Sequence, residues 1–312
     1  MSHPRKFRFG LQVPKAESAR AWRDIATKAE GQGFSTLFMP DHLEDQFAPM
    51  PALAAAAAAT TDLRIGVLVA DNDYRHPVVH AKELATLDVL SDGRLEVGIG
   101  AGWMRTDYDK SGIAYDPPGI RIDRFVEGLA VIKGLFADGP FSYEGRHYTI
   151  ADLDGLPKPL QRPHPPVLIG AGGPRMLAIA AREADIVGVN PSLRSGAVGM
   201  ATAADATLAA YDRKLTVLRE AAGARFDDLE LSCLLFFVVE TDDRLGFATN
   251  IAPMFGVSAE EALEVPVAVT GSVDEMCDQL ESRRERWGIS YVVCQAGAAD
   301  VLAPVVARLA GT

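Results

Sequence analysis

The sequence has few cysteines, no long apolar run and no excess of basic residues. Its three cysteines, Cys233, Cys277 and Cys294, lie far apart and form no C-x-x-C pair, which argues against a disulfide framework and a cysteine-ligated zinc site. We therefore expect a reducing, cytoplasmic environment. Asp and Glu outnumber Lys and Arg by 42 to 31, giving a net charge of −11. We expect neither nucleic acid nor an anionic membrane as a partner, because both require a basic face.

The lack of long apolar segments also argues against membrane insertion. No apolar stretch approaches the ~20 residues of a membrane span. The N-terminal segment "MSHPRKFRFGLQVPK" is basic at its start but has no apolar core, so we expect no signal peptide. The chain of 312 residues is 48% apolar, enough to bury a large core. We find no boundary between domains and expect one domain over residues 1–312.

Continuous apolar segments recur along the chain, and most are followed by a segment with helical spacing. Apolar runs without alternation are typical of strands in a parallel sheet that is buried on both faces. Eight such strand–helix units predict a (β/α)8 TIM barrel. The predicted strands are 7–13, 35–40, 63–70, 94–100, 166–170, 185–190, 229–239 and 289–294. The predicted helices are 17–34, 48–60, 76–91, 174–184, 201–222, 242–250, 258–264, 272–288 and 299–310.

Two insertions follow the fourth predicted strand. Residues 101–122 are polar, aromatic and rich in turn-forming residues, and residues 139–166 contain a predicted hairpin and then a proline-rich stretch. Loops of this length in a compact domain are usually functional or disordered. The aromatic residues in both segments argue against disorder, so we expect a functional role.

Polar or glycine-rich residues follow five consecutive predicted strands. In a (β/α)8 barrel the carboxyl ends of the strands form the rim that carries the active site. Each loop alone has a simpler explanation: Asp41 could cap a helix, and His42 could be a satisfied polar residue at a strand end. Five in succession favour an active site. The segments are Asp41–His42, 70–77 ("ADNDYRHP"), 100–103 ("GAGW"), 170–176 ("GAGGPRM") and 190–192 ("NPS").

The segment "VLIGAGGPRMLAIA" indicates a binding site for an anion. Glycines allow a ligand to approach the backbone closely, and Pro174 suits the first turn of a helix whose free N–H groups attract negative charge. A tight strand-to-helix turn is the alternative. The dinucleotide pattern G-x-G-x-x-G fails here because Arg175 occupies its last position, and it fails at 98–103 because of Trp103. We therefore do not expect NAD.

Four segments give the chain its resemblance to a known family. They are "AEGQGFSTLFMPDHL", "LDVLSDGRLEVGIGAGW", "LPKPLQRPHPPVLIGAGGPRMLAIAAREADIVGVN" and "TGSVDEMCDQLESRRERWGISYVV". The chain resembles the luciferase-like monooxygenase superfamily, in its coenzyme F420-dependent oxidoreductase branch. The resemblance implies a bacterial luciferase-like barrel that binds reduced F420 (F420H2) and transfers a hydride to an organic substrate, reducing an activated C=C or C=N bond. The alternatives are a two-component FMN-dependent monooxygenase and a non-catalytic cofactor-binding protein.

The resemblance also implies positions for the cofactor contacts. The phosphate is expected at Gly170–Pro174, and the ring beside the Asp41–His42 pair, with Asn72 at its edge. A non-proline cis peptide is expected near Leu68–Val69 or just beyond, where it would buttress the ring. The expected contacts are Asp41, His42, Leu68, Val69, Ala70, Asn72, Gly100, Gly102, Gly170, Ala171, Gly172, Gly173, Pro174 and Asn190.

His42 is the expected proton donor, held by Asp41, because a histidine titrates near neutrality. The alternative is that Asp41 only caps the following segment and His42 only contacts the cofactor. Many relatives carry a glutamate after the "GAGW" loop, whereas the nearest acids here are Asp107 and Asp109. The sequence therefore does not carry over a catalytic glutamate.

Tyr74, Trp103 and Tyr108 are expected to line the substrate wall, although aromatics in such loops could equally cover the barrel edge. His147 and His164 lack metal-ligand spacing, so we expect no metal site. The expected substrate is a small molecule or a modified peptide. The resemblance further implies a homodimer.

Overall fold

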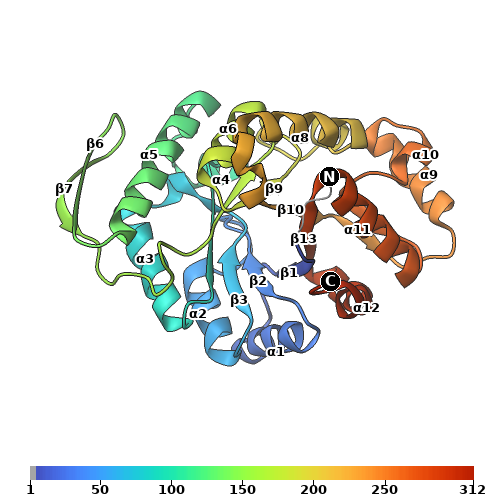
Figure 1. The fold of residues 1–312 in the computed structure, drawn as a ribbon, viewed down its shortest axis with the longest axis horizontal. Coiled ribbons are helices and arrows are strands. Elements are labelled where there is room, and N and C mark those ends of the chain that lie inside the picture. Colours follow the sequence, from blue (N-terminus) through green and yellow to red (C-terminus); the bar gives the residue numbers. More distant parts are fainter. Residues whose placement is uncertain (1–4) are drawn as a thin grey trace. The chain divides into compact units, whose positions relative to one another are not determined.

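The computed structural model describes residues 5–312; residues 1–4, which begin the N-terminal segment considered above, lie outside the described residues. The chain divides into two compact units, which we describe separately. Unit 1 runs to Val13 and includes Lys28–Leu37 and Ile169–Thr312. Unit 2 comprises Pro14–Thr27 and Phe38–Leu168. Figure 1 shows the elements in chain order, with most of unit 2 in blue to green and most of unit 1 in yellow to red.

The core of unit 1 is a set of parallel strands. β1 (Arg8–Gln12) pairs with β13 (Ile289–Gln295), β13 pairs with β10 (Glu230–Leu235), and β10 pairs with β9 (Ile186–Val189). Almost every residue of β9, β10 and β13 is buried. The continuous apolar runs in the sequence therefore reflect strands that are covered on both faces.

The helices of unit 1 follow its strands. α6 (Pro174–Glu183) packs along α8 (Leu208–Ala222) (Figure 1). The predicted helix 201–222 is wrong in one respect, because it is two helices. The first, α7 (Met200–Ala204), ends at Asp205, and the Thr207 side chain then caps α8 by accepting from the Ala210 N–H. The remaining helices of this unit are α9 (Arg244–Phe255), α10 (Ala259–Ala262), α11 (Val273–Trp287) and α12 (Ala299–Leu309).

The predicted strand 229–239 is also interrupted. β10 ends at Leu235, and residues Phe237–Val239 form β11, which pairs in parallel with β12 (Ala268–Thr270) in a separate two-stranded sheet. The sequence does not predict β12, because three residues are too few to display a periodic pattern.

In unit 2 the strands carry residues that the resemblance places beside the ring of the cofactor. β3 (Arg64–Val67) and β4 (Ala70–Asp71) both pair in parallel with β5 (Leu95–Gly100). The predicted single strand 63–70 is therefore broken, and the peptide bond between Leu68 and Val69 at the break is cis, as the resemblance implies. Two helices, α2 (Pro49–Ala59) and α3 (Pro77–Leu90), begin with proline and pack against each other.

The first insertion is more ordered than expected. Residues 101–122, predicted as a loop, contain α4 (Arg105–Ser111) and the start of α5 (Pro118–Phe136). Such a short polar helix has no apolar periodicity that could reveal it. The predicted hairpin is confirmed as β6 (Pro140–Glu144) and β7 (Thr149–Asp154), which lie beside α5 (Figure 1). A Glu127 carboxylate on α5 accepts from the backbone N–H groups of residues 146–148 and holds the hairpin in place.

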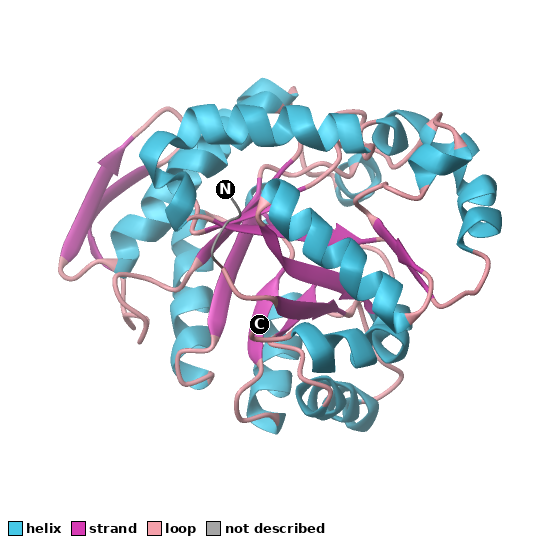
Figure 2. Cartoon of the chain, turned by 45° about the vertical axis from the view of Figure 1, so that its right-hand side comes forward, coloured by secondary structure: helices cyan, strands magenta, loops and turns pink. Residues whose placement is uncertain are grey.

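The order of the strands confirms the predicted barrel. Along the large sheet it is β3-β2-β1-β13-β10-β9-β8-β5-β4, and β3 also pairs with β5. Two strands, β2 (Thr36–Met39) and β8 (Val167–Ala171), include residues of both units. With β3 and β4 counted as one broken strand, this is the closed eight-stranded sheet of a (β/α)8 barrel. Along the chain, helices follow strands in both units, as α1 (Ala19–Gly31) follows β1. Figure 2 draws the helices in cyan and the strands in magenta.

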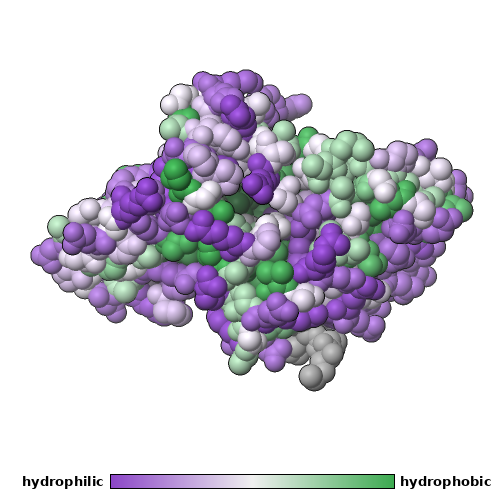
Figure 3. All heavy atoms as spheres, turned by 90° about the horizontal axis from the view of Figure 1, so that it is seen from above, coloured by the Kyte–Doolittle hydropathy of each residue, from purple (hydrophilic) through white to green (hydrophobic). Residues whose placement is uncertain are grey.

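Within residues 5–312 no helix has the length and apolar character needed to cross a membrane. On the face shown in Figure 3, apolar residues form small groups separated by polar ones. Three apolar side chains of α3 are exposed, Val79, Val89 and Leu90. Scattered exposed apolar residues are normal for a protein surface, so the expected homodimer stays a prediction.

The buried carboxylate of Asp88 provides a test of how the proline-rich segment is held. It accepts from the Leu160 N–H at 2.8 Å, the Gln161 N–H at 3.0 Å and the Gln161 side-chain amide at 2.7 Å. Asp88→Ala leaves these buried donors unpaired, so we expect the free energy of unfolding in urea to fall by about 3 kcal/mol. Asp109→Ala, which removes an exposed carboxylate paired with Arg105, is the control and should cost less than about 0.5 kcal/mol. A loss below about 1 kcal/mol for Asp88→Ala would show that the anchor is not needed.

Candidate functional site

The Asp41 carboxylate, in unit 2, connects the ends of two strands, β2 and β4. It follows β2, is buried, and accepts from Arg75 Nη1 at 2.7 Å and Nη2 at 3.2 Å. It also accepts from the Asp71 N–H at 3.0 Å. Asp41 therefore anchors the segment after β4, and the prediction that it holds His42 is wrong.

The residue that holds His42 is Asp107. The Nδ1 atom of His42 lies 2.8 Å from Asp107 Oδ2. The same carboxylate oxygen accepts from the Tyr74 hydroxyl at 3.0 Å, and Oδ1 accepts from the Leu43 N–H at 3.2 Å. Asp107 is 2% exposed, whereas the His42 side chain is 22% exposed. With Nδ1 bound to Asp107, Nε2 is the nitrogen that can reach a ligand.

Trp103 completes the surroundings of the imidazole. Its ring meets that of His42 edge to face, with centroids 5.4 Å apart and an interplanar angle of 88°. Both side chains are only partly buried. Trp103 and Tyr74 therefore both lie beside His42. That they line a substrate wall stays a prediction.

Asp107 reaches His42 because it lies in the first turn of α4. Acidic side chains are favoured there because the helix dipole places positive charge at that end. The helix ends at Gly112, whose φ of +78° is a left-handed cap. Our sequence reasoning treated this segment as a loop and did not assign Asp107 a role. The available signal was Gly112, a glycine suited to end a helix, which follows "GAGW" after eight residues.

The neighbouring Tyr108 points to a different group of carboxylates. Its hydroxyl lies 2.8 Å from Asp71 Oδ2 and 3.1 Å from Asp73 Oδ2, and its ring is fully buried. This burial contradicts the prediction that Tyr108 lines the substrate wall. Gly102 makes room for the hydroxyl: its φ is +74°, and a Cβ there would lie 1.9 Å from the Tyr108 oxygen.

The site in unit 2 carries more acids than bases. Arg75 neutralises Asp41, and Arg124 binds Asp73 through Nε at 2.7 Å and Nη2 at 3.0 Å. Burial raises the pKa of Asp71 to about 7, and the carboxylates of Asp73 and Asp41 act in the same direction. Burial, together with the nearby carboxylates, also raises the pKa of the Tyr74 and Tyr108 hydroxyls. Both tyrosines therefore remain hydrogen-bond donors at neutral pH.

Asn72 is packed into the protein. It is buried, its Nδ2 donates to the Tyr148 hydroxyl of the hairpin at 3.4 Å, and its Oδ1 faces α5. A Cβ at Gly128 of α5 would lie 2.2 Å from that oxygen. The predicted contact of Asn72 with the edge of a ring stays a prediction.

Small residues surround the cis peptide between Leu68 and Val69. A Cβ at Gly98 would lie 1.7 Å from the Val67 carbonyl oxygen, and one at Gly100 would lie 2.9 Å from the Val69 side chain. Glycines on β5 are therefore required for β5 to pack against this bend. Leu68 and Val69 are only partly buried, so part of each remains available to a ligand.

The glycine loop of unit 1 begins where β8 ends. Gly173 precedes α6 without a side-chain cap, and Pro174 starts the helix. A Cβ at Gly172 would lie 2.6 Å from the Pro191 carbonyl oxygen, whereas nothing lies within 4 Å of a Cβ position at Gly173. The first turn of α6 contains no acid. The loop therefore offers an open approach to the first-turn N–H groups of a helix, which favour an anion.

The structure thus groups the predicted contacts within each unit. In unit 1, Gly170–Pro174 are joined to Asn190, whose N–H donates to the Ala171 carbonyl at 2.9 Å. That one ligand contacts both groups stays a prediction. Across the described part of the chain no three His, Cys, Asp or Glu side chains are arranged to hold a metal ion. The residues grouped in unit 2 are Asp41, His42, Leu68, Val69, Ala70, Asn72, Tyr74, Gly100, Gly102, Trp103 and Tyr108.

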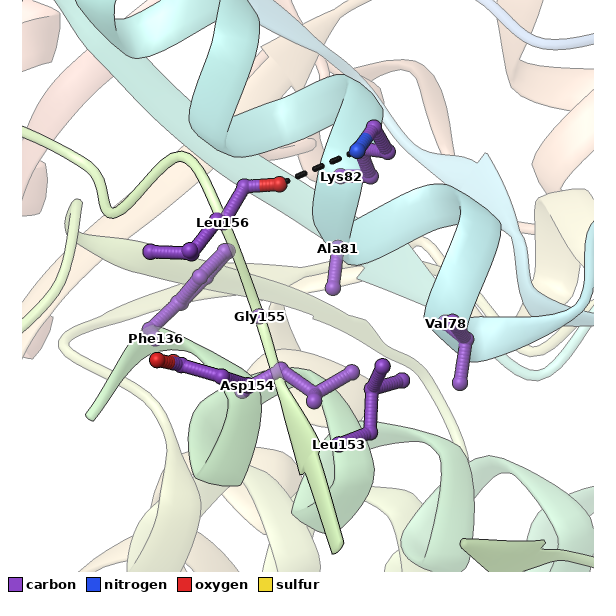
Figure 4. Close-up of a pocket in the computed structure, with 9 residues that line it drawn as sticks. Val78, Ala81, Lys82, Phe136, Leu153, Asp154, Gly155 and Leu156 are labelled. Atoms are coloured by element: carbon purple, nitrogen blue, oxygen red, sulfur yellow. Dashed lines mark hydrogen bonds between the residues drawn. The ribbon is translucent and has the colours of Figure 1, made fainter. Parts of the chain in front are cut away.

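An apolar groove of about 150 Å³ lies elsewhere on unit 2. It runs between α3 and the segment after β7, and Lys82 Nζ donates to the Leu156 carbonyl across it at 3.1 Å (Figure 4). None of the predicted site residues lines this groove. Its lining consists of Val78, Ala81, Lys82, Leu135, Phe136, Leu153, Asp154, Gly155 and Leu156.

The raised pKa of Asp71 predicts a pH-dependent stability. In the folded protein the pKa is about 7, above its ordinary value of 3.8, so the contribution of Asp71 is fully present at low pH and is lost as pH rises through 7. We expect Asp71→Asn to become more stable relative to wild type between pH 5.5 and pH 8.5, by roughly 2 kcal/mol. Urea unfolding at both pH values measures this difference. A stability difference that is the same at both values would contradict the assignment.

Comparison with known proteins places the chain in a family. The family model described as luciferase-like monooxygenase matches residues 5–244. An F420-dependent glucose-6-phosphate dehydrogenase of Nakamurella multipartita is 28% identical over 308 residues, which cover 92% of this chain and 84% of that protein. An FMNH2-dependent dimethylsulfone monooxygenase of Pseudomonas putida is 29% identical over 203 residues, which cover 59% of this chain and 56% of that protein. The chain spans 50–65% of the length of the first curated relatives it matches.

Solved structures support the same placement at the level of the fold. The coenzyme F420-dependent tetrahydromethanopterin reductase from Methanopyrus kandleri superposes with a TM-score of 0.78 at 20% identity, covering 98% of this chain and 100% of that one. With a family model that matches residues 5–244 and this shared barrel, the chain belongs to the luciferase-like monooxygenase family.

Proposed function

We propose that this protein is an F420H2-dependent oxidoreductase that reduces an activated C=C or C=N bond of an organic substrate. The observation that carries the proposal is the imidazole of His42, which is held through Nδ1 by the buried Asp107 and lies beside Trp103. Reduction of such a bond needs a proton as well as a hydride, and a positioned imidazole is a suitable proton donor.

The glycine loop of unit 1 fits the phosphate of such a cofactor. Any residue with a side chain at Gly172 would clash with the Pro191 carbonyl, and the approach to Gly173 is open. The first turn of α6 has no acid that would repel an anion. We propose that the N–H groups of this turn hold the phosphate. When bound, reduced F420 supplies the hydride.

We propose that His42 donates the proton from Nε2. The Asp107 carboxylate accepts from Nδ1–H at 2.8 Å, and this bond fixes the proton on Nδ1 and sets the orientation of the ring. Tyr74 donates to the same oxygen and restrains the carboxylate. After His42 gives up its proton, Asp107 still accepts from Nδ1–H, so the imidazole keeps its orientation through the step.

The aromatic side chains beside His42 would limit access of water. Trp103 packs against the imidazole and Tyr74 is tied to Asp107. Desolvation strengthens the hydrogen bond between imidazole and carboxylate. We propose that these two aromatics contact the substrate, a small molecule or a modified peptide.

The proposal treats residues 1–312 as one functional domain, since β2 and β8 each contribute to both units. A cytoplasmic homodimer is proposed with it. All three cysteines are buried and free, which supports the proposed reducing compartment.

The second candidate is a monooxygenase that uses reduced FMN delivered by a partner reductase. It is favoured by the FMNH2-dependent relative, and the glycine loop would hold the phosphate of FMN equally well. A non-catalytic cofactor-binding protein is a third possibility, but it gives no reason for a histidine held by a buried carboxylate.

The choice between the two cofactors can be measured directly. We expect the protein to bind coenzyme F420 more tightly than FMN in a fluorescence titration. We also expect it to oxidise F420H2 anaerobically in the presence of a competent substrate from a panel of enones, imines and dehydroamino acids. Turnover that requires reduced FMN and consumes oxygen would favour the monooxygenase instead.

Removal of the proton donor should reduce turnover without abolishing binding. We expect His42→Gln to lower kcat by about 100-fold or more, in the range contributed by general acids, while Kd for F420 changes little. Asp107→Asn should lower kcat by about 10-fold, because an amide N–H directed at Nδ1 disfavours the proton on Nδ1 and hence the doubly protonated ring that gives up its Nε2 proton.

Asp109→Asn is the matched control, because Asp109 lies on the same short helix but is exposed and paired with Arg105. It should have wild-type kcat. If His42→Gln turns over normally with normal cofactor binding, His42 is not the proton donor.

A further inference from the structure

Lys214 of α8 is a buried cation in unit 1 and is not one of the predicted site residues. Its side chain is only 6% exposed. Lysine is seldom buried unless it is paired, because removal of an ammonium group from water is costly.

The partners of Lys214 are a carbonyl of the glycine loop and a carboxylate at the junction between α7 and α8. Nζ donates to the Gly172 carbonyl at 2.9 Å and forms an ion pair with the Asp205 carboxylate. Asp205 Oδ2 also accepts from the Ser192 N–H at 2.7 Å. One ammonium group thus connects the glycine loop after β8, the loop after β9, and the junction between α7 and α8.

The two loops are closely packed where Lys214 connects them. A Cβ at Gly172 would lie 2.6 Å from the Pro191 carbonyl and 2.9 Å from Ser192 Cα. Next to this contact, the Asn190 N–H donates to the Ala171 carbonyl at 2.9 Å. The direction of the Gly172 carbonyl determines the orientation of the next peptide unit and hence the entry into α6.

We propose that Lys214 is a positioning residue that fixes the glycine loop and thereby sets the affinity for the phosphate of the bound cofactor. This inference rests on the proposed function, since it assigns the phosphate to this loop. Because Asp205 neutralises the ammonium, the effect of Lys214 comes through the geometry of the loop rather than through direct attraction of the anion.

The test compares ligands with and without a phosphate. Coenzyme F420 and its phosphate-free deazaflavin alcohol form one pair, and FMN and riboflavin form a second. Lys214→Met keeps the length of the side chain but removes both hydrogen bonds. We expect it to weaken binding of the phosphate-bearing ligand by about 10-fold or more, the size of a lost charge-assisted hydrogen bond. Binding of the phosphate-free ligand should change less than about twofold, and Lys214→Arg should recover part of the loss.

Arg283→Met is the matched control. Arg283 is also a buried cation of unit 1, but it donates to the carbonyls of Val265, Pro266 and Ala268. Its loss should leave unchanged the ratio of the affinity for the phosphate-bearing ligand to the affinity for the phosphate-free ligand. If Lys214→Met does not fold, Asp205→Asn tests the same network. It weakens both the ion pair with Lys214 and the hydrogen bond from the Ser192 N–H. It too should lower the affinity for the phosphate-bearing ligand selectively.

Two results would overturn the inference. One leaves the proposed phosphate site intact, and the other overturns that site as well. If wild type favours the phosphate-bearing ligand and the Lys214 and Asp205 variants keep the same preference, the phosphate site stands and the role of Lys214 is wrong. If wild type itself shows no preference for the phosphate-bearing ligand in either pair, the proposed phosphate site is wrong and the role of Lys214 fails with it.

Discussion

The hydrogen bond between the buried Asp107 carboxylate and His42 Nδ1 is the interaction on which the proposed chemistry depends. Asp107 is 2% exposed, and a carboxylate so placed must have its charge compensated. The Leu43 N–H, the Tyr74 hydroxyl and the imidazole supply that compensation. The same bonds leave Nε2 as the reactive nitrogen. One arrangement therefore both compensates the charge of the buried carboxylate and prepares His42 to donate a proton.

Around this pair, unit 2 balances several buried acids with few bases. Asp41 and Asp73 each have an arginine, whereas Asp71 has the Tyr108 hydroxyl and a raised pKa. Gly102 leaves room for the Tyr108 hydroxyl, and Gly128 of α5 leaves room for the Asn72 side chain. The first insertion supplies Trp103, Asp107 and Tyr108 to this cluster. In unit 1, Lys214 Nζ donates to the Gly172 carbonyl, and we propose that this bond fixes the glycine loop.

The sequence predicted what depends on local pattern. Continuous apolar strands, prolines at helix starts and the glycine loop at 170–174 were all readable, and the family resemblance located the cis bond at Leu68–Val69. The sequence did not predict which of the nearby carboxylates binds His42. Asp41 is adjacent to His42 in sequence, yet its carboxylate accepts hydrogen bonds from Arg75 and from the Asp71 N–H instead. Asp107 reaches His42 only because α4 turns it inward, and a seven-residue polar helix leaves no periodic signal. The burial of Tyr108 likewise follows from its acid partners.

The most direct test of the central claim is nitrogen NMR of histidine-labelled protein, with the His42 signals assigned by their loss in His42→Gln. We expect Nδ1 to carry a proton that is hydrogen-bonded and shielded from exchange with solvent, and we expect this signal to shift strongly in Asp107→Asn but not in Asp41→Asn. A His42 ring that is unprotonated at Nδ1, or one whose signals respond to Asp41→Asn and not to Asp107→Asn, would contradict the claim that Asp107 prepares this imidazole to give a proton from Nε2.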